Sequence, residues 1–213
     1  MAKQHFAAAL LIGLFGASTT QAASVSFYLD QSNKLADGVN YLQVTIADGL
    51  DGDIDFTVTA LQPLLDIAGD NFGIQRFAFN IVGGTATERR DITALPTDWR
   101  ARNDGRMAGF GRFDITLNGR GKPDSRQDPL TFSISGVSLD TILSYVDLST
   151  GRSPEGFSFF SAHVAGLNFG NCEPVNTKSA RSVSTSTVSN CVGSAFFGGT
   201  QAVPAPPAIW LLG

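Results

Sequence analysis

Asp53-Ile-Asp-Phe-Thr-Val-Thr-Ala60 is the stretch that decides the fold of this 213-residue chain. Ile54, Phe56, Val58 and Ala60 recur at every second position, and the residues between them are polar. Successive side chains of a β-strand point to opposite faces, so this period places all four apolar side chains on one face. The stretch therefore predicts a strand with one face in a core and the other in water.

The same alternation recurs on both sides of this stretch. Half-buried strands are predicted at 24–29, 41–46, 77–81, 113–117 and 130–134, an interior strand that is apolar on both faces at 157–165, and a last strand at 194–198. The 23 glycines suit the tight turns that such short strands need. This series predicts an all-β protein, an antiparallel two-sheet sandwich of jelly-roll-like type.

Two segments depart from the alternation. Leu139, Ile142, Leu143 and Val146 have helical spacing, which predicts one short helix that closes an end of the sandwich. The longest irregular stretch covers residues 83–106 and is expected to form a loop.

Charge is unevenly distributed in this chain, whose net charge is −4. Residues 23–83 hold eight Asp against two basic residues, whereas residues 84–127 hold nine Arg or Lys against six acids. No long basic run is present, which argues against nucleic acid as a partner. The basic region is either an ordinary mixed surface or a loop that faces an anionic polymer such as an acidic polysaccharide.

Ligand-binding candidates follow from this basic loop. They are Trp99, Arg89, Arg90 and Arg100, because an aromatic ring and guanidinium groups on one loop suit an acidic sugar. The alternative for Trp99 is a side chain that covers an edge of the core.

The segment Asp48-Gly-Leu-Asp51-Gly-Asp53-Ile-Asp55 is the candidate metal site. Alternating carboxylates in a Gly-containing turn can offer hard oxygen ligands to Ca²⁺, the one cofactor that the sequence brings into question. The alternative is a hairpin turn whose Asp53 and Asp55 lie on the solvent face of a strand.

The N-terminal segment has the composition of a secretory signal peptide. A short polar start with Lys3 precedes about ten small or apolar residues, too few to span a bilayer, and a polar segment follows. Thr20 and Ala22 are small enough for positions −3 and −1 of a cut before Ala23. Residues 1–22 are therefore predicted to be a signal peptide removed by signal peptidase, and residues 23–200 to be a β-sandwich ectodomain.

The C-terminal segment 201–213 contains Val203-Pro-Ala-Pro-Pro-Ala-Ile-Trp-Leu-Leu-Gly213. It resembles the sorting signal of PEP-CTERM proteins in its VPLPA-type variant, with Val203, Pro204 and Pro206 as the motif and Ala205 where Glu or Leu is usual. The order of the strands, with a closing Phe-Phe-Gly-Gly, is also similar to an ectodomain of that family.

The resemblance implies a protein that an exosortase-type membrane enzyme delivers to the envelope or to an exopolysaccharide matrix. The family's signal continues into a full membrane span and an Arg cluster. The printed sequence stops before either, so we expect the signal to be truncated or incomplete.

Cys172 and Cys191 are the only cysteines. An even pair in an exported chain predicts a disulfide that clips a surface loop.

The sequence offers few catalytic groups. After removal of residues 1–22, His163 is the single His, and neither a Gly-x-Ser-x-Gly elbow nor a phosphate-binding loop is present. We therefore expect a non-enzymatic protein of the periplasm, outer envelope or extracellular matrix of a Gram-negative bacterium, which binds extracellular polysaccharide. The alternatives are a carbohydrate- or Ca²⁺-dependent binding module and a polysaccharide-cleaving enzyme with two close carboxylates.

Overall fold

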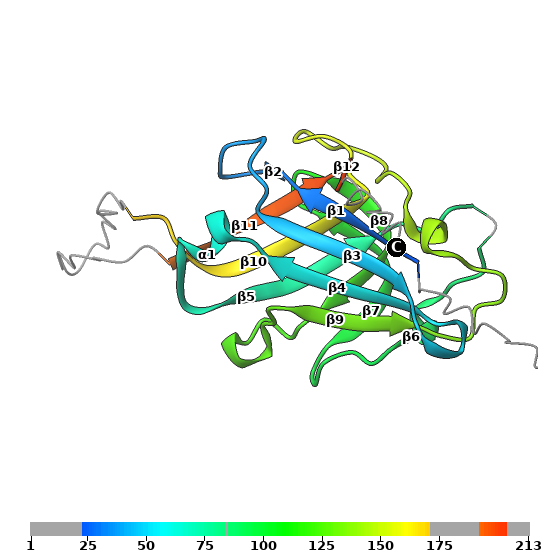
Figure 1. The fold of residues 1–213 in the computed structure, drawn as a ribbon. Helices are drawn as coiled ribbons and strands as arrows, with labels where there is room; N and C mark the ends of the chain where they lie inside the picture. Colours follow the sequence, from blue (N-terminus) through cyan, green and yellow to red (C-terminus); the bar gives the residue numbers. More distant parts are fainter. Residues whose placement is uncertain (1–22, 84, 171–191, 204–213) are drawn as a thin grey trace, which may run out of the picture.

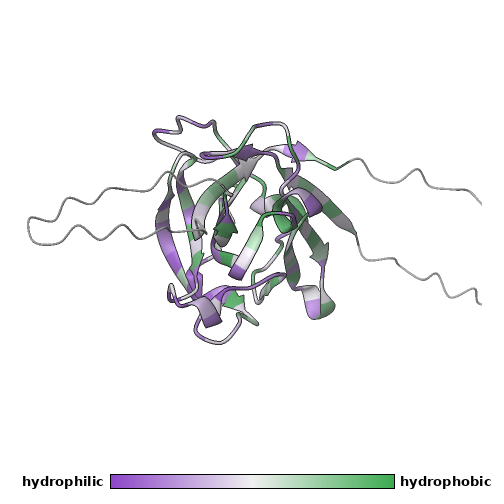
Figure 2. Cartoon of the chain, turned by 90° about the vertical axis from the view of Figure 1, so that its left-hand side faces the viewer, coloured by the Kyte–Doolittle hydropathy of each residue, from purple (hydrophilic) through white to green (hydrophobic). Residues whose placement is uncertain are grey.

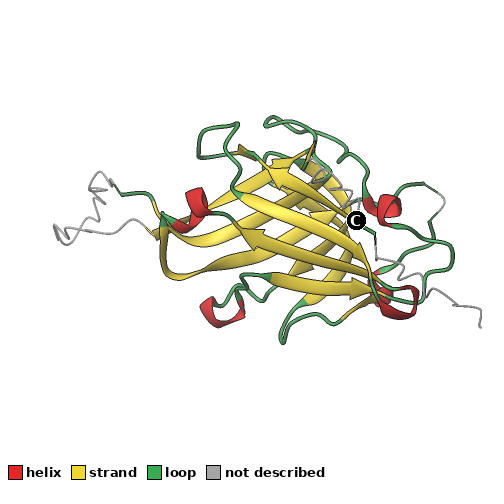
Figure 3. Cartoon of the chain, in the orientation of Figure 1, coloured by secondary structure: helices red, strands yellow, loops and turns green. Residues whose placement is uncertain are grey.

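The computed structural model describes residues 23–83, 85–170 and 192–203. It contains two antiparallel sheets of six strands each that pack face to face (Figures 1 and 3). The predicted all-β, antiparallel two-sheet sandwich is thereby confirmed, and the single short α-helix of the described residues lies elsewhere in the sequence than predicted.

Sheet A contains the alternating stretch at residues 53–60. In spatial order its strands are β12 (Gln201–Ala202), β1 (Ser24–Leu29), β3 (Leu42–Asp48), β4 (Ile54–Ala60), β9 (Leu130–Ile134) and β6 (Ile92–Thr93). In β3 and β4 every second residue is buried, as the alternation predicts. The sheet runs two residues beyond the predicted end of the ectodomain at residue 200.

Sheet B lies against the apolar face of sheet A. In spatial order its strands are β2 (Gln31–Ser32), β11 (Val192–Gly199), β10 (Phe160–Asn168), β5 (Ala68–Phe79), β8 (Gly111–Asn118) and β7 (Arg100–Met107). Figure 2 shows the bands of hydrophobic and hydrophilic residues that follow one another along the strands.

Phenylalanine rings from both sheets meet in one core. Phe56 of β4 stacks on Phe132 of β9, with ring centroids 4.7 Å apart, and on Phe79 of β5 in the other sheet at 5.3 Å. Phe77 and Phe160 stack within sheet B at 6.1 Å. These contacts join the two sheets, because each ring removes a large apolar surface from water.

The helix predicted at 139–146 is wrong in kind and place. The segment forms a 3₁₀-helix, η4 (Ile142–Tyr145), while Leu139 is 99% and Leu143 is 65% exposed. A 3₁₀-helix has three residues per turn, so Ile142 and Tyr145 share its buried side and the helical stripe is lost. The one α-helix in the described part of the chain, α1 (Gln62–Leu65), lies between β4 and β5 and has Pro63 in its first turn.

Part of the stretch expected to be irregular is an edge strand. Residues 83–106 include β6 and most of β7, which pairs with β8 from Arg100 to Met107. The strand predicted at 77–81 starts nine residues earlier, at Ala68, and ends at Phe79. The interior strand begins at Phe160 rather than at residue 157, and Phe157 is half exposed.

Several predictions fall on residues outside the described ranges. They are the signal peptide at 1–22, the Cys172–Cys191 disulfide, and Pro204 and Pro206 of the sorting motif. Val203 is described, and its N–H donates to the Ser26 carbonyl beside β1 at 2.8 Å. Within the described ranges, no helix is long and apolar enough to pass through a membrane.

Candidate functional site

Trp99 belongs to the core and offers no platform to a ligand. Its side chain is 6% exposed and packs in the main hydrophobic cluster, and its indole N–H donates to the Ser125 carbonyl at 2.6 Å. An indole bonded in this way has no free face at the surface. The predicted binding role is therefore wrong, and the alternative of an edge cover is correct.

The three arginines predicted beside Trp99 come from two neighbouring segments. Arg89 and Arg90 start the 3₁₀-helix η2 (Arg89–Asp91), which leads into the edge strand β6 of sheet A. Arg90 lies 3.5 Å from Glu88 and 3.8 Å from Asp91, so neighbouring carboxylates already balance its charge. Arg100 starts β7, the edge strand of sheet B, and η2 lies beside that strand, because the Arg89 N–H donates to the Asn103 side-chain oxygen at 3.1 Å.

The candidate Ca²⁺ turn is a hairpin between β3 and β4. Asp48 accepts a hydrogen bond from the Ala23 N–H at 3.2 Å, Asp53 accepts one from Ser135 at 2.8 Å, and Asp55 accepts one from Ser133 at 2.6 Å. Asp51 stands apart in the 3₁₀ turn η1 (Leu50–Gly52). The four carboxylates thus turn to separate partners, and the described part of the chain holds no group of three or more His, Cys, Asp or Glu placed for a metal ion.

A different set of arginines gathers on the outer face of sheet B. Residues directly opposite in an antiparallel pair share a face, which gives one row Phe196–His163–Arg76–Asn118–Arg100 across five strands. The next row ends in Ala78–Thr116–Arg102. We call the following set the arginine face: Arg76, Arg100, Arg102, Arg106 and Arg152.

None of the four ion pairs found among the described residues involves a member of the arginine face. Burial of Arg76, and next the positive charge of Arg102, lower the pKa of the Arg76 guanidinium. Both causes disfavour a charge that an arginine nevertheless keeps. A bound anion would counter the repulsion by Arg102 and offset the cost of burial with direct charge contacts, so the face is electrostatically suited to one.

Two shallow hollows flank Arg76 on this face. The first, of about 450 Å³, lies between Arg76, Arg102 and Arg120 and also touches Asp104, and we call it the Arg102 hollow. The second, of about 390 Å³, lies between Arg76, Arg106, Arg152 and the ring of Phe196, and we call it the Phe196 hollow. Because Arg76 lines both, a linear polymer can contact the two hollows in succession.

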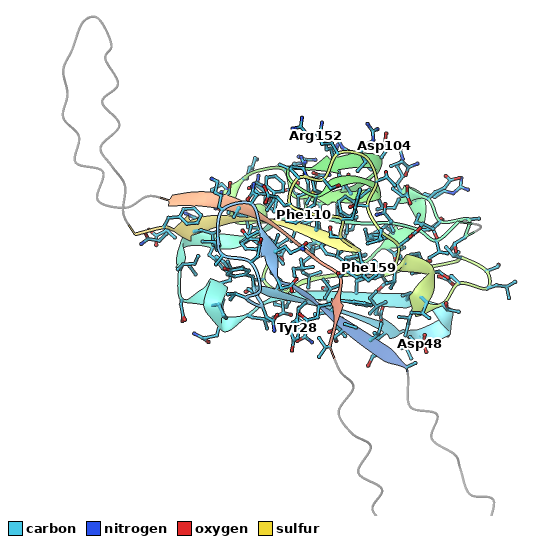
Figure 4. The ribbon with its side chains drawn as sticks, turned by 90° about the horizontal axis from the view of Figure 1, so that it is seen from above. Tyr28, Asp48, Asp104, Phe110, Arg152 and Phe159 are labelled. Atoms are coloured by element: carbon cyan, nitrogen blue, oxygen red, sulfur yellow. The ribbon has the colours of Figure 1, made fainter. Side chains whose placement is uncertain are left out.

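A surface loop brings Arg152 to the face. Residues 149–158 are closed by the bond from the Ser149 N–H to the Ser158 carbonyl at 2.9 Å, and Thr150 pairs with Arg112 of β8. Beneath them Phe110 is fully buried in a second apolar cluster with Met107, Phe113 and Ala78. Figure 4 shows Arg152 and Asp104 on the side of the molecule opposite Tyr28 and Asp48, with Phe110 below them.

His163 and Phe196 form a stacked pair beside Arg76. Their ring centroids are 4.2 Å apart and their planes differ by 11°. Burial, reinforced by the positive charges of Arg76, Arg126 and Lys34, lowers the pKa of His163 to about 4. The imidazole is therefore neutral at neutral pH, and it supports Phe196 rather than adding charge to the face.

Replacement of His163 by Gln is expected to flatten the acid side of the pH–stability profile. An unfolded His takes up its proton near pH 6.5, whereas the folded one does so near pH 4. As the pH falls through that window, the unfolded state binds a proton that the folded state does not, so stability falls. After allowance for solvent at the partly exposed ring, we expect a loss of about 1 to 2 kcal/mol.

Urea unfolding of both proteins at several pH values between the two pKa values measures this loss. The carboxylates titrate in both proteins, so the difference between their profiles isolates His163. Parallel profiles would contradict the prediction.

A third hollow, beside the middle of β8, brings two carboxylates together. Asp104 and Asp114 line it with Thr85, Thr87 and Asn103. Asp104 is in an ion pair with Arg112, and Asp114 accepts a hydrogen bond from the Ile81 N–H at 3.0 Å. Both carboxylates thus have partners within the fold, which weakens the case for a pair that hydrolyses glycosides.

The sequence contains a local signal for part of the arginine face. Arg100, Arg102 and Arg106 share one side of β7 because side chains alternate along a strand. The same alternation points Arg76 of β5 to the outer face and its neighbour Phe77 to the core. Arg152 and Phe196 have no such signal, because only the tertiary fold brings their segments to the same hollow.

Comparisons with known protein families, with curated proteins and with solved structures found no significant match to this chain.

Proposed function

We propose that this chain is an exported, non-enzymatic protein that binds an acidic polysaccharide on its arginine face. The observation that carries the proposal is the set of five arginines on one outer sheet face, none of them in an ion pair with a described carboxylate. A polyanion with regularly spaced charges can neutralise several of these groups together. The planar guanidinium fork also matches the geometry of a sugar carboxylate.

Charge separation across the molecule supports this assignment. The chain as a whole is acidic, with a net charge of −4. Asp48, Asp51, Asp53 and Asp55 lie on the β3–β4 hairpin of sheet A, whereas the arginine face lies on the outer surface of sheet B. The arginine face also carries Asp104, but that carboxylate is paired with Arg112, so the face keeps an excess of positive charge that favours a polyanion.

The non-enzymatic part of the proposal rests on the roles of the reactive groups. His163 packs against Phe196, Asp104 pairs with Arg112, and Asp114 bonds to the backbone of Ile81. Each group that could act as a general acid or base in a hollow thus contributes to the fold.

The exported location rests on the two terminal segments of the sequence. We propose that signal peptidase removes residues 1–22 and that an exosortase-type enzyme acts on the segment around Val203, Pro204 and Pro206. The protein then works in the periplasm, the outer envelope or the extracellular matrix of a Gram-negative bacterium, where acidic polysaccharides occur.

The test uses the full chain, expressed in a Gram-negative host and purified from the envelope fraction, where the N-terminus is expected at Ala23. Binding to alginate and to uncharged dextran is measured by affinity electrophoresis and calorimetry. We expect alginate binding that weakens as salt is raised from about 0.05 M to about 0.5 M, since screening shortens the range of each charge. The double variant Arg102→Gln/Arg106→Gln should bind about tenfold more weakly, at under 1 kcal/mol per exposed contact.

The matched control is Arg89→Gln/Arg90→Gln, which removes the same charge from η2, a segment beside β7 that lines neither hollow. It should change the affinity less than about twofold, because neither side chain lines a hollow and Glu88 and Asp91 already balance the charge of Arg90. Equal effects of the two double variants, no alginate binding, or recovery of only uncleaved protein from the cytoplasm would each contradict the proposal.

A further inference from the structure

We infer that the Phe196 hollow is a subsite for a single uronic acid residue, with the sugar ring against Phe196 and its carboxylate between Arg76, Arg106 and Arg152. This inference rests on the proposed function and deepens it from charge attraction to recognition of one sugar. The hollow combines an aromatic ring with three cationic side chains, and the described residues that line it include no carboxylate.

Phe196 is held in a fixed position. Its N–H donates to the Asn33 side-chain oxygen at 2.9 Å, and its carbonyl accepts from the Asn33 N–H at 3.2 Å. His163 stacks against the ring at 4.2 Å. A ring fixed in this way loses little conformational entropy when a ligand packs on it.

The cationic groups come from three separate segments. Arg76 extends from β5 and donates to the Arg106 carbonyl at 3.4 Å, Arg106 belongs to β7, and Arg152 comes from the 149–158 loop. The half-buried Arg76 is the one whose charge burial disfavours, so it gains most from a carboxylate. A carboxylate can accept two parallel N–H bonds from such a guanidinium.

Small residues complete the lining of the hollow. They are Ala108, Gly109 and Pro154, and the volume of about 390 Å³ lies at the small end of the range for ligand sites. Gly109 has φ of +95°, its backbone carbonyl accepts the Glu155 N–H at 3.0 Å, and the Glu155 side chain occupies the place of a Cβ at Gly109, so this part of the lining is fixed by the folded loop.

Contact with the aromatic ring would let the site distinguish a uronic acid from a simple anion. The C–H groups on one side of a pyranose ring form an apolar surface that packs on an aromatic ring, while the carboxylate lies at the rim of the sugar. Arg76 also lines the Arg102 hollow, so the next acidic sugar of a polymer can contact that hollow.

The experiment measures binding of trigalacturonate, of a sulfated trisaccharide and of neutral maltotriose to the full chain by calorimetry and saturation-transfer NMR. We expect trigalacturonate to bind, with saturation transferred to its ring protons, and maltotriose to be at least about tenfold weaker because the charge contacts are missing. Phe196→Leu should weaken trigalacturonate about tenfold, and Phe196→Tyr should restore most of the affinity, since a tyrosine ring also stacks.

Arg152→Gln provides a second variant on an exposed loop, where the fold is undisturbed, and it should weaken trigalacturonate about fivefold. The matched control is Phe157→Leu, since Phe157 is half exposed and does not line the hollow. If alginate binds through Arg102 and Arg106 but Phe196→Leu and Phe157→Leu behave alike, the subsite is wrong and the proposed function stands. Tighter binding of the sulfated trisaccharide would also overturn the uronic acid assignment, and a failure of alginate itself to bind would remove the proposed function.

Discussion

Replacement of Phe56 by Ala is expected to destabilise the protein by about 4 kcal/mol, the typical cost of removing a fully buried Phe from a core. Phe56 is 1% exposed, and its ring contacts Phe132 within sheet A, Phe79 in sheet B and Tyr145 of η4. The substitution thus removes aromatic contacts on three sides and leaves a cavity that two sheets cannot both close. Urea unfolding followed by tryptophan fluorescence measures the loss.

Two comparisons test whether the position or the chemistry is responsible. Phe56→Leu keeps most of the apolar volume and should cost about 1 to 1.5 kcal/mol. Phe157→Ala makes the same chemical change at a half-exposed residue and should cost under about 1 kcal/mol. If Phe56→Ala were no more destabilising than Phe157→Ala, Phe56 would not be at the centre of the sandwich.

Strands with a clean period of two were predictable because burial of one face makes apolar and polar residues alternate in the sequence. β1 begins and ends where the alternation predicts, and β4 is one residue shorter than its stretch. The sandwich architecture follows from these strands, since each apolar face must be covered by another layer.

The elements that could not be predicted lack this alternation of apolar and polar residues. β7 is an edge strand with charged residues and an Asn103-Asp-Gly105 segment, which is typical of a turn, although here it continues the pairing with β8. Asp104 has φ of +52°, a local distortion that Asp tolerates better than most residues. The helical stripe at 139–146 fails for a different reason, because Leu139, with φ of +64°, stands before the capped turn at Thr141.

The candidate site was predictable in region but not in composition. The excess of basic residues in 84–127 pointed to the right part of the chain, and Arg100 lies on the face that resulted. Trp99 next to it is buried, because adjacent residues of an extended segment point to opposite sides. The meeting of Arg76 with Phe196 needed the pairing of β10 with both β5 and β11, and Arg152 needed the Thr150–Arg112 bridge to β8, which no local pattern specifies.

A single bulge in β10 connects the core to the outer face of sheet B. Phe160, Ala162 and Val164 point into the core, and Ser161 and His163 lie on the outer side. The register with both neighbouring strands shifts between Ala165 and Leu167, so Gly166 is an extra residue and Leu167 turns inward, where it is fully buried. Without the bulge Leu167 would lie on the same side as His163.

Replacement of Gly166 by Ala is therefore expected to destabilise the protein by about 3 to 4 kcal/mol, since it adds a left-handed backbone penalty to a steric clash. Gly166 has φ of +79°, and an added Cβ would lie 2.5 Å from the Asn71 carbonyl oxygen and 2.6 Å from the Phe72 Cα. Both atoms belong to the backbone of β5, in the short segment opposite Gly166 that lies between the Ala165–Gly73 and Leu167–Ala68 pairs. These two pairs hold the segment against Gly166, so it cannot move away without disturbing the register of β5 with β10.

Gly38→Ala is the matched control, because Gly38 has φ of +81° but no atom within 4 Å of an added Cβ. It should lower the free energy of unfolding only by the cost of placing a non-glycine residue at positive φ, about 1 kcal/mol. The difference between the two variants in urea unfolding thus isolates the close approach of β5 and β10. Similar losses of stability for both variants would mean that glycine is needed at position 166 only for its positive φ. The inward position of Leu167 would then not depend on the absence of a side chain at the bulge.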